Sequence, residues 1–255
     1  MLGAVLCCAS LSHAQPITLF SGLVPPVSYL NPDDNQARGM AVDMMHEVIA
    51  CTGDKAQISA HPWPRAVKLF DTTPYSGLFV ADRTPEREHR YQWVGPIYRS
   101  TFGFYALSSA DIRVRNFSEL KNAGTVAVPR DWQVVERAKK EGLTNILEVS
   151  DTHQLLAMLR SERVSVIGID ELMLHSLSYK AEEIKRLIRY ADVNGFLALS
   201  KDIPTAQVRR WQRCFDKLKQ QGVYQRIYLH WVGQPAPTND EQRFRSTSSS
   251  LAQPL

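Results

Sequence analysis

The sequence has few of the features that would assign it to a membrane-spanning, nucleic-acid-binding or metal-dependent class. After residue 14, no apolar run approaches the ~20 residues needed to cross a bilayer. Lys and Arg exceed Asp and Glu by only four, and no basic run occurs, so nucleic acid is not an expected partner. There is no Ser-His-Asp set, HExxH, phosphate loop or paired-cysteine metal motif. We therefore expect no cofactor and no metal.

Charged residues are also missing from the N-terminus. Residues 1–14, MLGAVLCCASLSHA, contain no Asp, Glu, Lys or Arg and are mostly small or apolar. Ser12-His13-Ala14 ends in the small-x-small pattern that signal peptidases cleave. We predict a signal peptide over 1–14 and a soluble, exported protein in the periplasm, with a buried N-terminal helix as the alternative. Neither cysteine of this segment follows an acceptable lipobox, which favours a free protein over a lipoprotein.

Cysteine is scarce in the rest of the chain. Beyond the predicted signal peptide only Cys51 and Cys214 remain. Two cysteines in an oxidising compartment predict one disulfide, and two separate buried thiols are the alternative. Because the two residues are far apart in the sequence, a bond between them would require the start and the end of the chain to share one lobe.

The C-terminus lacks aliphatic residues. Residues 234–255 are rich in Pro, Ser, Thr and Gln, and cannot bury enough apolar surface to offset the entropy of ordering. We predict a disordered tail there. The remaining core has room for one large domain or for two lobes of about 100 residues each.

Apolar periodicity predicts alternating strands and helices between these ends. Strands are predicted over 16–23, 57–60, 78–81, 101–107, 125–128, 146–149, 164–169 and 195–200. Helices are predicted over 41–49, 66–70, 117–120, 133–140, 155–159 and 205–221, with a closing segment over 223–231. This alternation indicates an α/β protein with βαβ crossovers and a mostly parallel sheet.

The order of these elements predicts two successive α/β units with a ligand cleft between them, because open α/β sheets bind ligands beyond the carboxyl ends of their strands. A Cys51–Cys214 bond would return the last helix to the first unit. The chain would then cross twice, near Leu107 and near Asn194, and two crossings make a hinge. The predicted lobes are 15–107 with 195–233, and 108–194.

Residues 77–107 form the most informative stretch. The apolar run 78–81 leads directly into a charged turn, which contains Asp82, Arg83, Thr84, Glu86 and Arg87. Aromatic residues and a second β-rich run follow. Charged side chains at the end of a strand, beside aromatic residues, favour a site for a small charged ligand. A hairpin with a solvated tip is the alternative.

Six blocks of residues occur in an order typical of one protein family. They are Gly39 to Asp43 (Gly-x-x-x-Asp), Thr84 to Arg87 (Thr-x-x-Arg), Gly95 to Tyr98, Leu120 to Val128, Gly168 to Glu171 and Gly222 to Tyr228. With these blocks the chain resembles the family-3 bacterial extracellular solute-binding proteins, periplasmic receptors of polar amino-acid uptake systems. The resemblance implies the type II periplasmic-binding-protein fold, in which two α/β lobes hold a ligand cleft at their hinge.

The resemblance also implies ligand contacts. Arg87, the Arg of Thr-x-x-Arg, is expected to bind a ligand carboxylate, since a guanidinium matches a carboxylate in bidentate fashion. The second-lobe acid, Asp170, is expected to bind an ammonium group, and Tyr29 or Trp63 to pack on the apolar part of the ligand. The alternatives are an ion pair of Arg87 with Glu86 or another nearby acid, a helix N-cap for Asp170, and core packing for the two aromatic residues.

The chain departs from this family pattern at the site itself. Amino-acid-binding relatives usually have small hydroxyl residues before Thr-x-x-Arg, where this chain has Val80, Asp82 and Arg83. Residues 129–132 (Pro-Arg-Asp-Trp) replace a loop that is often rich in Gly and Ser or Thr. The ligand is therefore expected to be an amino acid, a modified amino acid, an organic acid or a small peptide-like molecule. The candidate ligand-binding set is Arg87, Asp170, Asp82, Thr84, Tyr29, Trp63, Arg130, Asp131 and Trp132, with Arg130 a second anion contact and Asp82 and Asp131 cation contacts.

The sequence favours a monomeric binding protein that captures its ligand by hinge closure. Its partner would be an ABC permease in the inner membrane or a sensor protein. The alternative is an enzyme similar to cyclohexadienyl dehydratase, because some proteins of this fold dehydrate cyclic carboxylates. Such chemistry needs a general acid or base, for which Glu171, Asp82 and His175 are the candidates.

Overall fold

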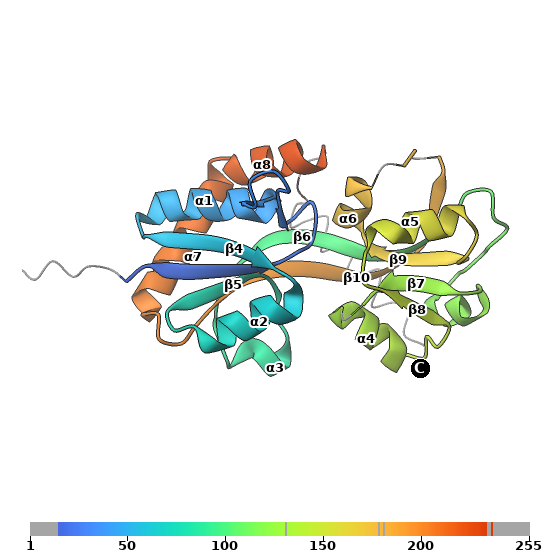
Figure 1. Ribbon diagram of the computed structural model, residues 1–255, viewed down its shortest axis with the longest axis horizontal. Coiled ribbons are helices and arrows are strands. Elements are labelled where there is room, and N and C mark those ends of the chain that lie inside the picture. The colour runs from blue at the N-terminus through green and yellow to red at the C-terminus, as the bar shows by residue number, and fades with distance from the viewer. Residues whose placement is uncertain (1–14, 131, 178, 181, 234–235, 237–255) are drawn as a thin grey trace, which may run out of the picture.

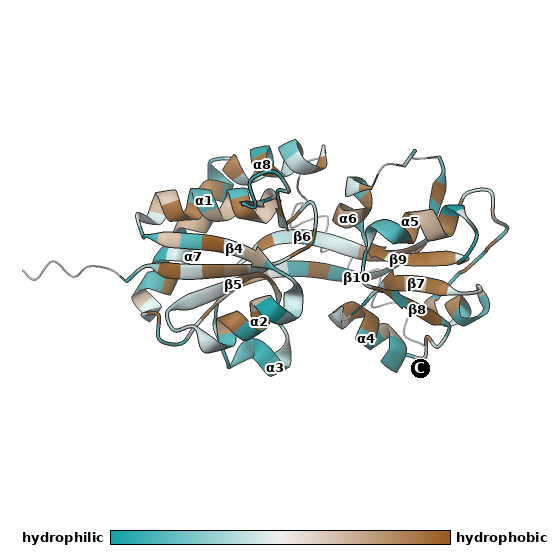
Figure 2. Cartoon of the chain, in the orientation of Figure 1, coloured by the Kyte–Doolittle hydropathy of each residue, from teal (hydrophilic) through white to brown (hydrophobic). Residues whose placement is uncertain are grey.

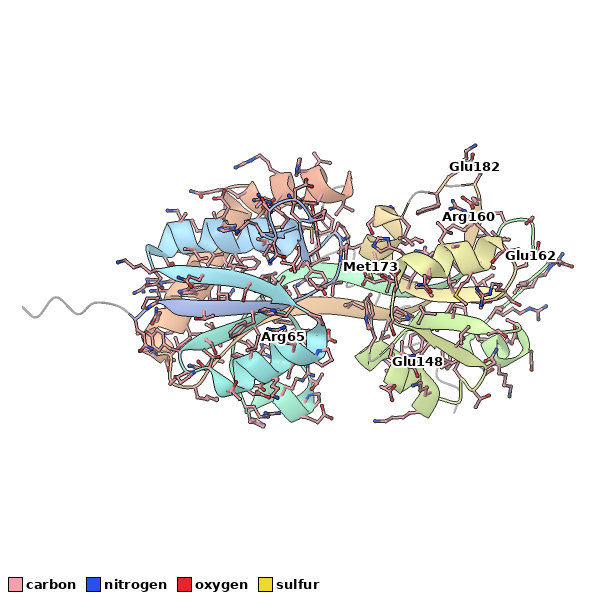
Figure 3. All side chains as sticks on the ribbon, in the orientation of Figure 1. Arg65, Glu148, Arg160, Glu162, Met173 and Glu182 are labelled. Carbon is pink, nitrogen blue, oxygen red and sulfur yellow. A yellow bond between two sulfur atoms is a disulfide. The ribbon has the colours of Figure 1, made fainter. Side chains whose placement is uncertain are left out.

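The computed structural model describes residues 15–233 and 236, apart from residues 131, 178 and 181. The predicted signal peptide and, except for residue 236, the predicted tail lie outside the described residues. The described elements gather in two lobes (Figure 1). In Figure 3 the side chains form two corresponding groups, with Arg65 in the first lobe and Glu148, Arg160 and Glu182 in the second.

The strands are β1 (Ile17–Gly22), β2 (Tyr29–Leu30), β3 (Ala37–Arg38), β4 (Ala56–His61), β5 (Ser76–Asp82), β6 (Gln92–Leu107), β7 (Val126–Pro129), β8 (Ile146–Val149), β9 (Val166–Asp170) and β10 (Ile184–Leu199). The helices are α1 (Met40–Thr52), α2 (Trp63–Thr72), α3 (Pro85–Glu88), the 3₁₀ helix η1 (Phe117–Asn122), α4 (Gln133–Lys140), α5 (His153–Arg160), α6 (Glu171–Ser176), α7 (Thr205–Gln220) and α8 (Val223–Val232). Within these described elements, no helix is long and apolar enough to span a membrane.

One sheet runs through both lobes, with strand order β4-β1-β5-β10-β6-β9-β7-β8. In the first lobe β1 is parallel to β4 and β5, and in the second lobe β7 is parallel to β8 and β9. Between these groups, β10 pairs antiparallel with β5 and β6, and β6 pairs antiparallel with β9. The sheet is therefore mixed, and its two parallel parts are joined by the antiparallel pair β6–β10.

The pair β6–β10 connects the lobes and was only partly predicted. Each of the two strands has 16 residues and continues from one lobe into the other (Figure 1). The prediction contained only the last residues of each strand, 101–107 and 195–200. The missed part of β10 is mostly polar or partly exposed, and the middle of β10 is largely teal where β7 and β9 are brown (Figure 2). The missed part of β6 buries Val94, Ile97 and Tyr98, but Gly95 and Pro96 interrupt its apolar pattern. A strand that joins two lobes lacks the continuous apolar face on which a strand prediction depends.

Apolar side chains pack on both faces of the sheet in each lobe. In the first lobe, a large cluster that contains Trp211 and Phe79 lies against α1, α7 and α8, and a smaller one around Phe70 lies against α2. In the second lobe, one cluster includes Leu159 of α5, and the other includes Phe104 and residues of η1 and α4. Each lobe therefore has its own core on each side of the sheet.

Helix α7, near the end of the chain, is bonded to the first lobe. Cys51 of α1 forms a disulfide with Cys214 of α7, which confirms the predicted pairing. Asp54, just after α1, accepts a hydrogen bond from Trp211 Nε1 at 2.5 Å and forms an ion pair with Arg210. The start and the end of the described chain thus meet in one lobe.

Candidate ligand cleft

Two adjoining cavities lie where the ends of β5 and the middle of β10 meet residues of both lobes. The larger, of about 480 Å³, is lined by Asp82, Arg83, Thr84, Pro85, Glu86, Trp132, Val134, Arg137, Ala191, Asp192, Val193, Asn194 and Phe196. The smaller, of about 80 Å³, is lined by Val24, Trp63, Val80, Asp82, Tyr98, Trp132 and Val193. Because Asp82, Trp132 and Val193 line both cavities, we treat the two as one cleft.

Strand register places three residues of the cleft side by side. Asp82 at the end of β5 pairs with Gly195 of β10, and Gly195 in turn pairs with Tyr98 of β6. A Cβ atom at Gly195 would lie 1.8 Å from Cε1 of Tyr98. Glycine is therefore required at 195, because the Tyr98 ring lies directly against the backbone there.

Val80 has a backbone conformation that β-branched residues seldom adopt. Its φ is 64°, in the left-handed region. The register between β5 and β10 shifts between Phe196 and Ala198, which leaves Phe79 and Val80 opposite a single residue, as in a β-bulge. Such a conformation costs of order 1–3 kcal/mol and is found most often at functional sites. Val80 lines the smaller cavity, so the strained residue belongs to the cleft.

The Asp82 carboxylate has no hydrogen-bond donor among the described residues. Burial raises the pKa of the Asp82 carboxyl, and the nearby Arg87 guanidinium opposes this shift only in part. A half-buried carboxylate without hydrogen-bond donors is less well solvated than one in water, and a cation in the cleft would stabilise it.

Arg87 lies beside two residues of the cleft, Asp82 and Trp63, but itself lines neither cavity. Its Nη1 donates to the backbone carbonyl of Asp82 at 3.5 Å, and its guanidinium lies 5.9 Å from the centre of the Trp63 ring. Trp63 itself packs against Gly22, where a Cβ atom would lie 2.8 Å from Trp63 Cε3. Within the described part of the chain, no ion pair joins Arg87 to Glu86 or to any other acid. Its guanidinium keeps donors for a ligand.

The other cations of the cleft already have carboxylate partners. Arg83 donates to both carboxylate oxygens of Glu88 at 2.6 Å and lies over the rings of Trp93 and Phe196. Arg137 of α4 donates to Glu141 at 2.7 Å. These ion pairs fix the two guanidinium groups at the cavity wall and neutralise their charge.

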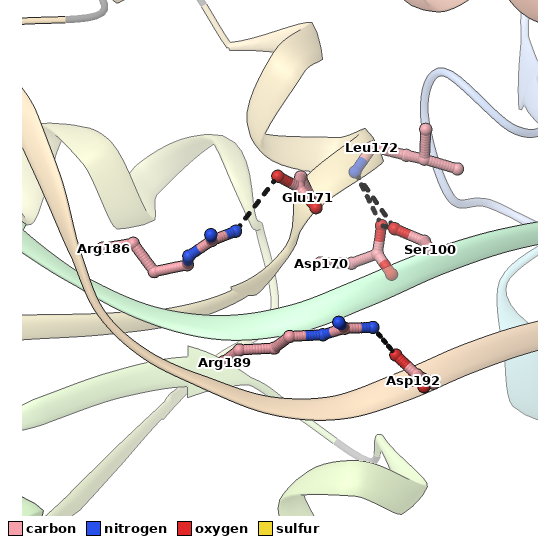
Figure 4. Close-up of polar contacts among 7 residues, drawn as sticks. All are labelled: Ser100, Asp170, Glu171, Leu172, Arg186, Arg189 and Asp192. Atoms are coloured by element: carbon pink, nitrogen blue, oxygen red, sulfur yellow. Dashed lines mark hydrogen bonds and ion pairs between the residues drawn. The ribbon is translucent and has the colours of Figure 1, made fainter. Parts of the chain in front are cut away.

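Asp170 begins α6 and is engaged in the local structure. Its Oδ1 accepts hydrogen bonds from the backbone N–H of Leu172 at 2.9 Å and from Ser100 Oγ at 2.7 Å (Figure 4). Its Oδ2 is buried without a partner among the described residues. Burial raises the pKa of Asp170 to about 7, although these hydrogen bonds oppose the shift. Asp170 therefore is an N-cap, the alternative considered for it, and it lines neither cavity.

The remaining predicted residues divide between the cleft and other surroundings. Trp132 lines both cavities, and Thr84 lines the larger one. Tyr29 instead packs edge-on against Trp231 of α8, with ring centres 6.1 Å apart. Arg130 is exposed and lines neither cavity. Asp131 lies outside the described residues.

The candidate acids for catalysis lie mostly outside the cleft. Glu171 pairs with Arg186 at 3.4 Å (Figure 4), and His175 is exposed on α6. Only Asp82 of the three lines a cavity. Within the described part of the chain, no group of three or more His, Cys, Asp or Glu side chains is arranged to bind a metal ion.

Sequence reasoning missed the cleft residues on the hinge strands. Val193, Asn194 and Phe196 come from β10, which was predicted only from residue 195. Tyr98 was noted within the block Gly95 to Tyr98, but it was not assigned to the site. That aromatic residue after Pro96 was the one signal available in the sequence.

The family assignment follows from a sequence model that matches residues 18–234 and describes bacterial extracellular solute-binding proteins, family 3. The chain belongs to this family. No curated protein is similar enough in sequence to count as a relative.

Solved structures of low sequence identity have the same fold. The substrate-binding protein of an amino acid ABC transporter has 17% identity and a TM-score of 0.70, and the match covers 86% of this chain and 100% of that one. A histidine kinase sensor domain with similarity to periplasmic binding proteins has 13% identity and a TM-score of 0.75, with 88% and 99% covered. An ancestral amino-acid-binding protein, a precursor of cyclohexadienyl dehydratase, has 16% identity and a TM-score of 0.71, with 85% and 95% covered. The predicted type II periplasmic-binding-protein fold is confirmed.

Proposed function

We propose that this family-3 protein captures a small charged solute in the periplasm by closing its two lobes, and delivers the solute to an ABC importer. The observation that supports this proposal is that one cleft takes its walls from both lobes and its floor from the two strands that join them. A ligand in this cleft would contact Trp63 of the first lobe and Trp132 of the second, so binding would favour the closed arrangement.

We assign a ligand carboxylate to Arg87. Its guanidinium lies next to the cleft residues Asp82 and Trp63 without an ion-pair partner among the described residues, whereas Arg83 and Arg137 are paired with glutamates. A planar guanidinium binds a carboxylate through two parallel hydrogen bonds. An amino acid or a related carboxylate is the ligand class that this contact favours.

Delivery to a sensor is the second candidate for the downstream step. The sensor domain of a histidine kinase has this fold, with a TM-score of 0.75. The capture step would be the same in both cases. A dehydratase is less well supported, because Glu171 and His175 do not line the cleft.

The test is a thermal-shift screen of amino acids and organic acids against the wild type, Arg87→Ala and Arg213→Ala. Arg213 is an exposed arginine of α7 and serves as the matched control for loss of one positive charge. We expect a ligand that raises the melting temperature of the wild type and of Arg213→Ala but not of Arg87→Ala, and that is recovered unchanged. A full response by Arg87→Ala would remove Arg87 from the site, and turnover of the ligand would favour the enzyme.

A further inference from the structure

The charges that line the cleft are unequally paired. Arg83 and Arg137 are each bonded to a glutamate, and Asp192 is bonded to Arg189 (Figure 4). Two acids remain. Glu86 is exposed and accepts a hydrogen bond from Thr84. The Asp82 carboxylate has no described hydrogen-bond donor, and the cation beside it is Arg87, whose guanidinium opposes the rise of the Asp82 pKa only in part.

Asp82 lines both cavities. Its side chain is half-buried, and burial raises the pKa of its carboxyl group. A ligand cation is the chemical group that would supply the missing stabilisation, through a charge-assisted hydrogen bond.

Aromatic rings surround this carboxylate from both lobes. Trp63 comes from the first turn of α2 in the first lobe, and Trp132 directly precedes α4 in the second. Both line the smaller cavity with Asp82, and Tyr98 lines it from the hinge strand β6. Indole faces attract organic cations and also pack well against apolar groups. The remaining lining residues of this cavity are valines, Val24, Val80 and Val193.

Asp170 is a poorer match for a ligand cation. Its Oδ1 is used by Ser100 and by the N–H of Leu172. Its Oδ2 has no described partner but is buried, and Asp170 lines neither cavity. The Asp82 carboxylate accepts no described hydrogen bond and lines both cavities.

We propose that Asp82, rather than Asp170, binds a protonated amine of the ligand, and that Trp63 and Trp132 enclose the aromatic or apolar group that bears this amine. The inference rests on the proposed capture function and narrows its ligand class to amino acids and other amines that carry an aromatic or apolar group. Because the two tryptophans belong to different lobes, the apolar group is covered on both sides only when the lobes are closed.

Isothermal titration calorimetry with three probes that share a phenylethyl group tests the charge. Phenethylamine carries a cation, 3-phenylpropionate an anion, and 2-phenylethanol no charge. We expect phenethylamine to bind roughly tenfold or more tightly than 2-phenylethanol, since a hydrogen bond between charged groups contributes that factor or more. Binding of 3-phenylpropionate would report on the carboxylate contact assigned to Arg87. Binding of phenethylamine no tighter than that of 2-phenylethanol, or no binding of phenethylamine, would overturn the proposal.

Variants then locate the cation. Asp82→Asn keeps the size of the side chain and should weaken the binding of phenethylamine at least tenfold. Glu47→Gln removes one exposed negative charge of α1, far along the chain from the cleft residues, and should leave binding unchanged. Trp132→Leu should weaken the binding of phenethylamine more than the binding of butylamine, which has no ring. Circular dichroism checks that each variant is folded. A loss with Asp170→Asn, in place of Asp82→Asn, would assign the amine to Asp170 and refute the inference.

The outcomes separate this inference from the proposed function. If a compound of the amino-acid and organic-acid panel binds through Arg87 but is insensitive to Asp82→Asn, the ligand class is wrong and solute capture stands. If no compound of either set binds, both are wrong.

Discussion

In the first lobe, the Cys51–Cys214 disulfide and the Asp54 ion pair bond α7 to the rest of the core, and the Asp54 side chain is 6% exposed. In the second lobe, the most buried side chain in a described ion pair is that of Glu183, which is 25% exposed. No described disulfide lies there. The second lobe depends on apolar packing, while the first has covalent and ionic cross-links in addition.

The unfavourable features of the cleft lie on the cross-linked lobe. Val80 has a left-handed backbone, and Asp82 has no described donor, and both are at the end of β5. The second lobe contributes Trp132, whose packing against Phe102 involves no strained backbone or unpaired charge. Strain at a binding site persists only where the surrounding structure fixes it, and the first lobe supplies that support.

Removing the disulfide would test this difference most strongly. We expect Cys51→Ala with Cys214→Ala to lower the free energy of unfolding by about 5 kcal/mol, because the bond closes a very long loop of the unfolded chain. Urea denaturation of the oxidised wild type and of the double variant measures this difference in the free energy of unfolding. Equal stability of the two proteins would show that apolar packing alone supports the first lobe.

Asp170 should make the second lobe sensitive to pH. Its folded-state pKa of about 7 lies above the ordinary Asp pKa of 3.8. The folded state therefore binds the proton more tightly, and stability is lost as pH rises from about 4 to about 7. At about 1.4 kcal/mol for each pKa unit, the wild type should lose about 4 kcal/mol relative to Asp170→Asn between pH 4 and pH 8.

Urea titrations of the two proteins at several pH values measure this difference. The two proteins are compared by how much the free energy of unfolding of each changes with pH. Any destabilisation by the Asn side chain that is the same at every pH therefore cancels. Parallel stability curves across the range would mean that Asp170 is ionised in the folded protein at all these pH values.

Val80→Gly should have the smallest effect on stability. The loss of a buried valine is offset by relief of the left-handed strain, so we expect a change within about 1 kcal/mol. Val166→Gly in β9 removes a fully buried valine, 0% exposed against 7% for Val80, from ordinary strand backbone and should cost about 3 kcal/mol or more. Thermal or urea unfolding of both variants measures the two losses of stability. Similar losses of stability in the two variants would show that the Val80 backbone is unstrained.

Much of the fold could be predicted because its elements have local patterns. The apolar spacing of α1 and of α7, and the short apolar runs of β5 and β7, are visible in a few turns or residues. The middle of β10 could not be predicted in this way. Its polar residues face the cleft, and its strand conformation depends on pairing with β6, which is distant in the sequence.

The site was predictable only in part, for a similar reason. The turn after β5 indicated Asp82, Thr84 and Arg87, since charged residues directly follow a buried strand. Asp170 has an equivalent position after β9, but it caps α6 instead of lining the cleft. Two strand-end acids with the same sequence pattern thus have different surroundings, and only their neighbours in space distinguish them.

The sequence by itself determined the alternation of strands and helices, the pair of cysteines and the charged turn at 82–87. These are properties of neighbouring residues, which periodic burial and local hydrogen bonding encode. The tertiary structure decided that Asp82, Gly195 and Tyr98 lie side by side, and that Trp63 and Trp132 line one cavity. Register between distant strands and the approach of the two lobes depend on the packing of the whole core, which no local pattern contains.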